Sequence, residues 1–403
     1  MSERRSESES EWPAVSFEEH PWVARDDLPA ARSARRLARG PYRAAVPALI
    51  ARRSLVLPSS IAASAEDAAG EVARFDEQMG REIAPFAAVL LRSESAASSK
   101  IEQLTASARA IAEAELGGNR SGNAPFIVAN VRAMNAAVAL ADRIDAGAIL
   151  AMHSALLRDQ WPEVAGRWRS EQVWIGGSDI SPHGAVFVPP HHDRVRSAIA
   201  DLMAFIARDD IPVLAQAALA HAQFETIHPF PDGNGRTGRA LLHAQLRNKG
   251  LTRNVTVPIS AGLLADTGAY FDDLTAYRVG DHLAIVERLI AASFAAVDNG
   301  GRLVRDLRTI REQWNDLVVA RRHATTWRLA DLLLRQPVVN RRVIADELSI
   351  APENVYRVLQ PLVDADVLVE VTDKKRNQMW RCQEVLDALD AFATRAGRRR
   401  RAR

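Results

Sequence analysis

The sequence has a single cysteine, Cys382, among its 403 residues, and this excludes an internal disulfide bond. It has no apolar run close to the roughly 18 residues that a membrane-spanning helix needs. The charged start Met1-Ser2-Glu3-Arg4-Arg5 lacks the apolar segment of a signal peptide. The net charge of +2 says little about partners. These absences predict a cytoplasmic protein that does not bind a membrane.

The length allows two or three domains, and a hydrophobic content of 47% supports real cores. Residues 1–11 have almost no apolar content, so we expect them to be disordered. Helices are predicted between residues 59 and 90, with an interruption at Pro85, and over residues 130–141 and 146–157. The first of these has core-facing residues at helical spacing, namely Ile61, Ala68, Val72, Phe75 and Met79.

Most of the reactive side chains lie in one short stretch between two predicted helices. The stretch reads His228-Pro229-Phe230-Pro231-Asp232-Gly233-Asn234-Gly235-Arg236-Thr237-Gly238-Arg239. Before it, residues 213–227 have helical periodicity, and Pro229 should end that helix with His228 at its C-terminal edge. After it, helical periodicity resumes from Arg236, so the glycines form the entry to a helix N-terminus.

These residue types in this order suit a polyphosphate. Backbone N–H groups and the positive end of a helix dipole favour an anion, and glycine lets the backbone come close to it. Arg236 and Arg239 are three residues apart, on the same side of the new helix, and both can contact one polyphosphate. Asp232 is placed to hold Mg²⁺ beside the phosphates. Histidine ordinarily titrates near neutrality, so we expect His228 to accept a proton from an attacking hydroxyl.

At these residues the sequence resembles the Fic family, whose signature is His-Pro-Phe-x-Asp/Glu-Gly-Asn-Gly-Arg-x-x-Arg, and every fixed position is filled. The resemblance implies a helical Fic fold and a protein adenylyltransferase that moves AMP from ATP to a hydroxyl side chain. It implies ATP as substrate, bound by residues 232–239 with Asp232 on Mg²⁺, and His228 as the catalytic base. Removal of AMP, or transfer of another phosphate group, is the alternative that the motif leaves open.

A second segment resembles the family's inhibitory motif, Ser/Thr-x-x-x-Glu-Gly/Asn. Ser98 and Glu102 fit this pattern, whereas Gln103 replaces the expected Gly or Asn. The resemblance implies that Glu102 pairs with Arg239 and limits productive ATP binding. Without the family context, the same residues are typical of a capping serine and a surface glutamate on a helix.

A β-hairpin is predicted over residues 170–188, with turn residues from Gly176 to Gly184 between two short strands. By resemblance this hairpin is a flap, Val173–Val188, which binds the target protein by adding it as a strand. The protein itself is a second expected target. His191 and His192 follow the hairpin, but adjacent histidines on an exposed loop are usually solvated, and we do not assign them as metal ligands.

Beyond the motif, residues 261–277 are predicted to form a helix that carries Tyr270 and Phe271. By resemblance this aromatic pair stacks near the nucleotide base, and an ordinary core role is the alternative. Residues 281–297 should form the last helix of the catalytic domain, which we expect to end at Asp298-Asn299-Gly300-Gly301.

The C-terminal part resembles a winged helix. Residues 340–348 and 352–364 are predicted helices joined by a tight turn, and two short strands flank the basic loop 372–377. Pro361 is expected to interrupt the second helix. DNA binding through Arg357, Lys374, Lys375, Arg376 and the arginine-rich tail is one interpretation, with the catalytic domain then acting as a nucleotide sensor. Docking of a protein, including a second copy as a homodimer, is the other.

The expected fold class is therefore mainly α, a helical Fic fold with a small hairpin flap and a C-terminal winged helix-turn-helix-like domain. The predicted domains are a disordered start (1–11), an N-terminal extension with the inhibitory helix (12–110), the Fic catalytic core (111–300), a connector helix with the winged-helix-like domain (301–394) and a basic tail (395–403).

Overall fold

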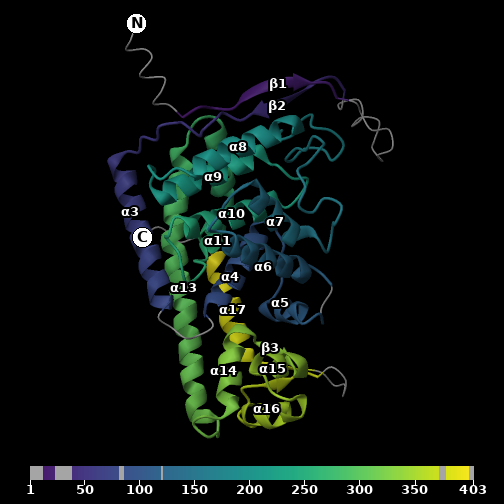
Figure 1. Ribbon diagram of the computed structural model, residues 1–403, viewed down its shortest axis with the longest axis vertical. Coiled ribbons are helices and arrows are strands. Elements are labelled where there is room, and N and C mark those ends of the chain that lie inside the picture. Colours follow the sequence, from purple (N-terminus) through teal and green to yellow (C-terminus); the bar gives the residue numbers. More distant parts are fainter. Residues whose placement is uncertain (1–11, 23–38, 81–85, 119–120, 372–377, 399–403) are drawn as a thin grey trace. The chain divides into compact units, whose positions relative to one another are not determined.

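The computed structural model describes residues 12–22, 39–80, 86–118, 121–371 and 378–398 (Figure 1). The described chain is mainly helical with small antiparallel sheets, as predicted. Within these ranges, no helix is long and apolar enough to cross a membrane. The expected disorder of residues 1–11, the basic loop 372–377 and the end of the arginine tail all fall outside the described residues.

The chain divides into two compact units, and each is assembled from three separate stretches of sequence. The first unit takes residues 1–67, 136–249 and 268–290, and the second takes residues 68–135, 250–267 and 291–403. Among the described helices, α3 (Ser59–Gly80), α6 (Ala124–Ala139) and α13 (Leu283–Leu317) contribute several residues to each unit, and α12 (Thr267–Arg278) contributes its first residue to the second unit and the rest to the first.

The first unit is built around one buried helix. Its other elements are β1 (Ser16–His20), β2 (Tyr42–Val46), α7 (Ala146–Leu157), the 3₁₀ turn η1 (His192–Arg194), α8 (Val195–Ile206), α10 (Asn234–Asn248) and α12 (Thr267–Arg278). The central helix α9 (Val213–Ile227) is buried on every side because alanine, leucine and other compact residues surround its axis. It packs between α8 and α10 (Figure 1).

The hairpin β1–β2 was not predicted from the sequence. Its strands are antiparallel, with Ser16 opposite Val46 and His20 opposite Tyr42. Alanine and arginine in β2 are poor strand formers, so local propensity gave no strand signal. Burial of Tyr42, Ala44 and Ala45 stabilises the strand instead.

The second unit is centred on α4 (Phe86–Ile101). Its remaining elements are α5 (Ala108–Glu115), α11 (Ile259–Leu263), η2 (Leu264–Asp266), α14 (Thr325–Arg335), β3 (Val338–Asn340), α15 (Arg341–Leu348), η3 (Pro352–Asn354), α16 (Val355–Asp364), β4 (Val369–Glu370), β5 (Met379–Arg381) and α17 (Gln383–Ala396). Helix α4 packs against α11, α14 and α17. Its buried Glu94 accepts hydrogen bonds from the Ser260 backbone N–H at 2.8 Å and from the Ser260 hydroxyl, which ties α11 to α4.

The predicted helix end at residues 298–301 is wrong, because α13 runs without a break from Leu283 to Leu317. A Cβ atom at Gly300 would lie 3.2 Å from Phe75 and 3.4 Å from Pro258. Glycine at this position therefore allows close packing inside a helix and is not a stop signal. The predicted single helix 261–277 is also wrong, because α11, η2 and α12 replace it.

In the C-terminal part, α14, β3, α15, α16, β4 and β5 follow one another, and the three strands form a sheet in the order β3-β5-β4. Ser349 adopts a left-handed conformation (φ 53°) in the turn after α15. The expected interruption at Pro361 is wrong, because this proline lies inside α16. The strand β3 was not predicted from the sequence.

Candidate active site

His228 occupies the position predicted for it, at the end of α9. It is the C-cap residue, in a left-handed conformation with φ 48° and ψ 62°, and its N–H donates to the Phe224 carbonyl at 2.9 Å. A residue other than glycine rarely adopts this conformation, which costs of order 1–3 kcal/mol and is common at functional sites. The backbone therefore turns sharply at His228 and sends the chain into the motif loop.

The motif loop is closed by the side chain of Asn234. Its amide oxygen accepts from the Phe230 N–H at 2.9 Å, and its amide nitrogen donates to the Phe230 carbonyl at 2.9 Å. Both bonds are buried. The sequence predicted that Asn234 binds ATP, and the structure commits its side chain to the loop itself, so the backbone N–H is the group left to contact a ligand.

Phe230 anchors the centre of the loop. Its fully buried ring stacks on His153 with ring centroids 3.7 Å apart, and on Trp168 at 5.0 Å. The His153 Nδ1 atom accepts from the Gly166 N–H at 3.0 Å, so its Nε2–H donates to the Asp232 carbonyl at 3.1 Å. Burial lowers the pKa of His153 to about 4, which keeps it neutral. No local signal in the sequence identified His153.

The glycines begin α10 as predicted. Gly233 is the N-cap with φ 75°, and the first helical bond runs from the Thr237 N–H to the Gly233 carbonyl at 3.0 Å. A Cβ atom at Gly233 would lie 2.8 Å from Leu156, so any other residue would clash as well as being strained. The first N–H groups of a helix lie before its first helical bond and point toward the solvent end, so the start of α10 forms an anion-binding helix end.

The charged residues of the motif differ in exposure. Arg236 and Arg239 are 3% and 2% exposed, whereas the side chain of Asp232 is 52% exposed. Arg236 Nη2 lies 3.3 Å from the Asp232 carboxylate. Thr237 and Gly238 face the protein interior, since Thr237 is fully buried and a Cβ atom at Gly238 would lie 2.9 Å from Phe224. Of these residues, Asp232 offers the accessible carboxylate that a cation beside phosphates needs.

A buried arginine that sequence reasoning missed holds the His228 turn. Arg169 is 4% exposed and donates to the carbonyls of His228 at 2.8 Å, Glu171 at 3.1 Å and Pro190. Its backbone N–H donates to the Pro229 carbonyl at 3.0 Å. One side chain thus joins the turn at His228 to both ends of the hairpin. Burial lowers the pKa of Arg169 to about 10, so it stays charged at neutral pH.

A second buried arginine, Arg278 at the end of α12, was also missed. Its guanidinium lies over the Phe187 ring, 3.8 Å from the centroid. It is 9% exposed. Burial and the positive charges of Arg169 and Arg278 lower the pKa of His228 to about 3. The imidazole, whose side chain is 19% exposed, is therefore an unprotonated base at neutral pH.

Tyr270 and Phe271, which were predicted to lie near the nucleotide base, have two different environments. Tyr270 is 1% exposed, and its hydroxyl lies 2.7 Å from Nε2 of the buried His221. Phe271 is 49% exposed. Tyr270 therefore has the core environment, while Phe271 presents an open aromatic face.

The predicted hairpin is present but has little regular strand structure. Ile175 and Phe187 form an isolated antiparallel bridge, in which the Ile175 N–H donates to Phe187 at 2.8 Å and the Val186 N–H donates to Ile175 at 2.9 Å. The two strands predicted over residues 170–175 and 185–188 are therefore too long. Val186 is 78% exposed on this hairpin.

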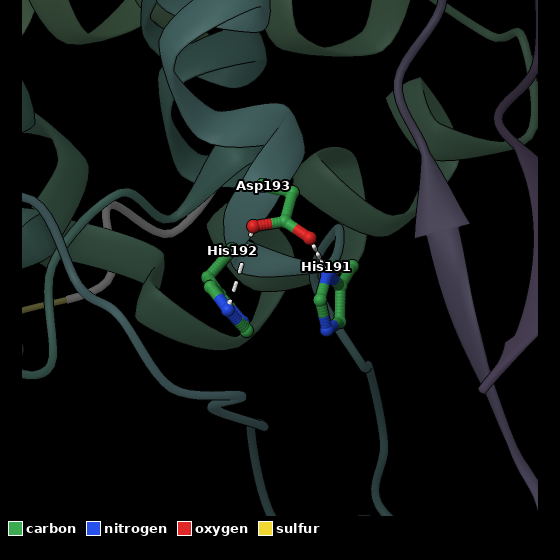
Figure 2. Close-up of side chains that lie close together, drawn as sticks. All are labelled: His191, His192 and Asp193. Carbon is green, nitrogen blue, oxygen red and sulfur yellow. Dashed lines mark ion pairs between the residues drawn. The ribbon is translucent and has the colours of Figure 1, made fainter. Parts of the chain in front are cut away.

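His191 and His192 lie where the hairpin leads into α8, and Figure 2 shows both rings beside the carboxylate of Asp193. The distances to this carboxylate are 3.2 Å from His191 Nδ1 and 3.6 Å from His192 Nε2. The three residues have ligand atoms close enough together to hold a metal ion. The ring of His191 also stacks on His20 of β1, with centroids 4.3 Å apart. The cluster joins the base of the hairpin to β1.

The segment resembling an inhibitory motif lies in the second unit, at the end of α4. Ser98 is fully buried, and Glu102 follows the last helical residue. Gln103 is left-handed, with φ 63°. The Gln103 N–H donates to Lys100 at 2.9 Å and the Leu104 N–H donates to Ser99 at 3.0 Å, the pattern of a Schellman helix end. Such a position favours Gly or Asn, which explains the small residue in the family's form of the motif.

Comparisons with known proteins find similarity to one family. Residues 143–246 match the Fic/DOC family. The chain is 36% identical over 135 residues to a probable protein adenylyltransferase of Aquifex aeolicus, which covers 30% of this chain and 42% of that protein. It is 29% identical over 159 residues to the protein adenylyltransferase fic-1 of Caenorhabditis elegans, covering 39% of this chain and 28% of that protein.

The chain thus spans less than half the length of these curated relatives. Among solved structures, a Fic family protein from Desulfovibrio desulfuricans G20 is 22% identical, with a TM-score of 0.51 over 82% of this chain and 97% of that chain. This likeness shows a shared fold. The similarity to the Fic/DOC family itself lies in residues 143–246.

Proposed function

We propose that the protein is an adenylyltransferase that moves AMP from ATP to a Ser, Thr or Tyr hydroxyl of a protein. One observation carries this proposal: His228 ends α9 within the same loop that opens the N-terminus of α10. An unprotonated base and an anion-binding helix end therefore lie together. The named relatives are adenylyltransferases, which supports the same activity here.

The reaction uses the loop as follows. The phosphates of ATP bind the N–H groups that begin α10, with Arg236 and Arg239 neutralising their charge. The target hydroxyl attacks the α-phosphorus, its proton passes to the imidazole of His228, and the bond to pyrophosphate breaks. Asp232 would hold Mg²⁺, which supplies charge neutralisation at the phosphates. Phe271 offers a ring for the adenine, while Tyr270 supports it from the core.

The target protein binds at the flap Val173–Val188. The Val173 N–H makes no backbone hydrogen bond within the described residues, so it is a donor on which an extended peptide can form a strand. Arg169 couples this flap to His228 through carbonyls on both. The protein's own side chains are included among the targets.

Glu102 restrains the reaction in this proposal by pairing with the guanidinium of Arg239, which would otherwise contact the outer phosphate. The helix end at Gln103 fixes the backbone that carries Glu102. Removal of AMP, by the same groups acting on a modified hydroxyl, is the alternative direction of the same chemistry.

Purified protein incubated with ATP and Mg²⁺, with intact mass as the readout, tests the proposal. Wild type should gain the mass of AMP slowly, Glu102→Gly faster, and the double variant Glu102→Gly/His228→Ala not at all. Glu113→Gly, which removes an acid from α5, is the matched control and should behave like wild type. Equal modification with and without His228 would contradict the proposal.

A second candidate function is DNA binding by residues 325–381. The order α14-β3-α15-α16-β4-β5 with the sheet β3-β5-β4 favours a winged-helix assignment. Arg357 is exposed on α16, the helix that would enter the major groove. Titration of duplex DNA into the full chain at several salt concentrations tests it, since each phosphate contact adds about 0.9 to the salt slope. The variant Arg357→Ala should weaken binding, and salt-independent or absent binding would favour a protein-docking role.

A further inference from the structure

The second unit contains a pocket that is lined by no residue of the motif loop. Its volume is about 170 Å³, and its walls come from α4, α5, α17 and the segment that follows α4. The apolar part of the wall includes Ala97, Leu104, Ile111, Leu389 and Phe392. An apolar cavity of about 150 Å³ is large enough to bind benzene. The pocket therefore has room for a small ring or a short branched chain.

The charged residues of the pocket differ in the strength of their hydrogen-bond partners. Arg92 is held by both oxygens of Glu115, at 2.9 and 2.8 Å, and by the Arg335 carbonyl. Asp390 accepts the Ala108 N–H at 2.9 Å, at the start of α5. Lys100 has only the Ala393 carbonyl, at 3.2 Å, and no carboxylate within ion-pair distance in the described part of the chain. One positive charge thus lies beside an apolar wall with a weak, neutral partner.

We propose that this pocket binds a small monocarboxylate with an aromatic or branched aliphatic body. The body packs among the apolar residues, and the carboxylate replaces the Ala393 carbonyl as the partner of Lys100. A charge-assisted bond to a carboxylate is roughly twice as strong as a bond between neutral groups, so the exchange favours the ligand. For about ten non-hydrogen atoms we expect a Kd of about 10 μM to 1 mM.

The position of Lys100 gives the ligand a route to regulation. Lys100 lies in the last turn of α4, two residues before Glu102, and its bond to Ala393 joins this turn to the C-terminal end of α17. A carboxylate that withdraws Lys100 from α17 loosens the turn that carries Glu102. This step rests on the proposed inhibition by Glu102, and it predicts that the ligand raises self-modification by about fivefold. Binding itself does not depend on that function.

Calorimetry on the full chain with phenylacetate and its neutral isostere phenylacetamide tests the binding. Wild type should bind the acid at least about tenfold more tightly than the amide. Lys100→Met should lose this preference, while Arg305→Met, which removes an exposed cation of α13, should keep it. Ala97→Phe should fill the pocket and weaken both ligands. Equal affinities in wild type, or no saturable binding of either compound, would overturn the proposal even if one variant fails to fold.

Self-modification measured with and without phenylacetate tests the regulatory step. The rate should rise in wild type and stay unchanged in Glu102→Gly, which has already lost the inhibitory carboxylate. A similar rise in Glu102→Gly would overturn regulation through Glu102. If wild type and Glu102→Gly both transfer no AMP, the proposed function fails, and the calorimetry still decides whether the pocket binds a carboxylate.

Discussion

The buried carboxylate of Asp76 in the second unit and the buried polar atoms around His228 in the first unit differ in how completely their hydrogen-bonding capacity is satisfied. In the second unit, Asp76 is 4% exposed and accepts hydrogen bonds from the backbone N–H groups of Arg253, Asn254 and Val255. In the first unit, the buried atoms His228 Nδ1, Thr237 Oγ1 and Arg278 Nε lack a hydrogen-bond partner among the described residues. Buried polar atoms are normally paired, so exceptions in and beside the motif loop fit the proposed ligand site. Asp76 therefore stabilises the fold, whereas the three first-unit atoms lie in or beside the proposed active site.

His228→Ala should have the largest effect, and it should fall on activity. Loss of the general base should reduce AMP transfer by about a thousandfold, while ATP affinity stays within about twofold, because the phosphates bind backbone and arginine. Intact mass and calorimetry measure the two quantities. His323→Ala, at an exposed site, is the control. A large loss of ATP affinity in His228→Ala would place the histidine in binding and not in catalysis.

Asp76→Ala should show the opposite pattern. It leaves three backbone donors without their acceptor, so the free energy of unfolding should fall by about 2 kcal/mol or more, while the activity of the folded fraction is unchanged. Urea unfolding measures this. Asp67→Ala, at an exposed position of the same helix, should change stability by less than about 0.5 kcal/mol. A loss of activity without a loss of stability would remove the distinction between the two regions.

Acid should lower the folding stability of the first unit, because its buried histidines bind protons more readily in the unfolded chain. Burial and the positive charge of Arg239 lower the pKa of His221 to about 3 from its ordinary 6.5. Below pH 6.5 the unfolded chain binds a proton that the folded chain does not, so stability is lost as pH falls. At pH 5 the loss from His221 alone is about 2 kcal/mol. Unfolding curves at pH 7.5 and 5.0 should show a smaller pH dependence in His221→Gln, and an unchanged dependence would contradict the assignment.

A substitution in the flap should reduce modification of a partner protein and leave ATP affinity unchanged. Val173→Pro removes a backbone donor that no hydrogen bond within the hairpin uses, so modification of a partner protein should fall about tenfold with ATP affinity unchanged. Val173→Ala keeps the donor and should behave like wild type. Val186→Pro is a poorer test, because the Val186 N–H already donates to Ile175. Equal loss of both functions in Val173→Pro would mean that the hairpin is structural.

Local chemistry made the motif loop predictable from the sequence. Pro229 and Gly233 end one helix and begin the next: α9 ends at Ile227 as predicted, and α10 begins at Asn234, two residues before the predicted Arg236. The same rule gave a wrong helix end at Gly300, where glycine allows close packing and the helix continues. Glycine signals a helix end only when its backbone turns left-handed, as at Gly233 and not at Gly300.

The residues that support the site could not be predicted, because their partners are distant in sequence. Arg169 contacts the carbonyls of His228 and Pro190, and Arg278 meets the Phe187 ring. Every residue has a backbone carbonyl, so an arginine that binds carbonyls produces no recognisable motif in the sequence. The two hydrogen bonds from the Asn234 side chain to the backbone of Phe230 were missed for the same reason.

Substitutions at Gln103 should have the smallest effect, and they test a single backbone turn. It is exposed and left-handed with φ 63°, so its side chain contributes strain without packing. Gln103→Gly should raise the free energy of unfolding by roughly 1 kcal/mol, because glycine adopts this conformation without a Cβ clash. A firmer helix end should also hold Glu102 better, which in the proposed mechanism lowers self-modification. Gln103→Ala keeps the Cβ atom and should leave both quantities near wild type. If Gln103→Gly and Gln103→Ala shift stability equally, the side chain and not the backbone conformation controls this turn.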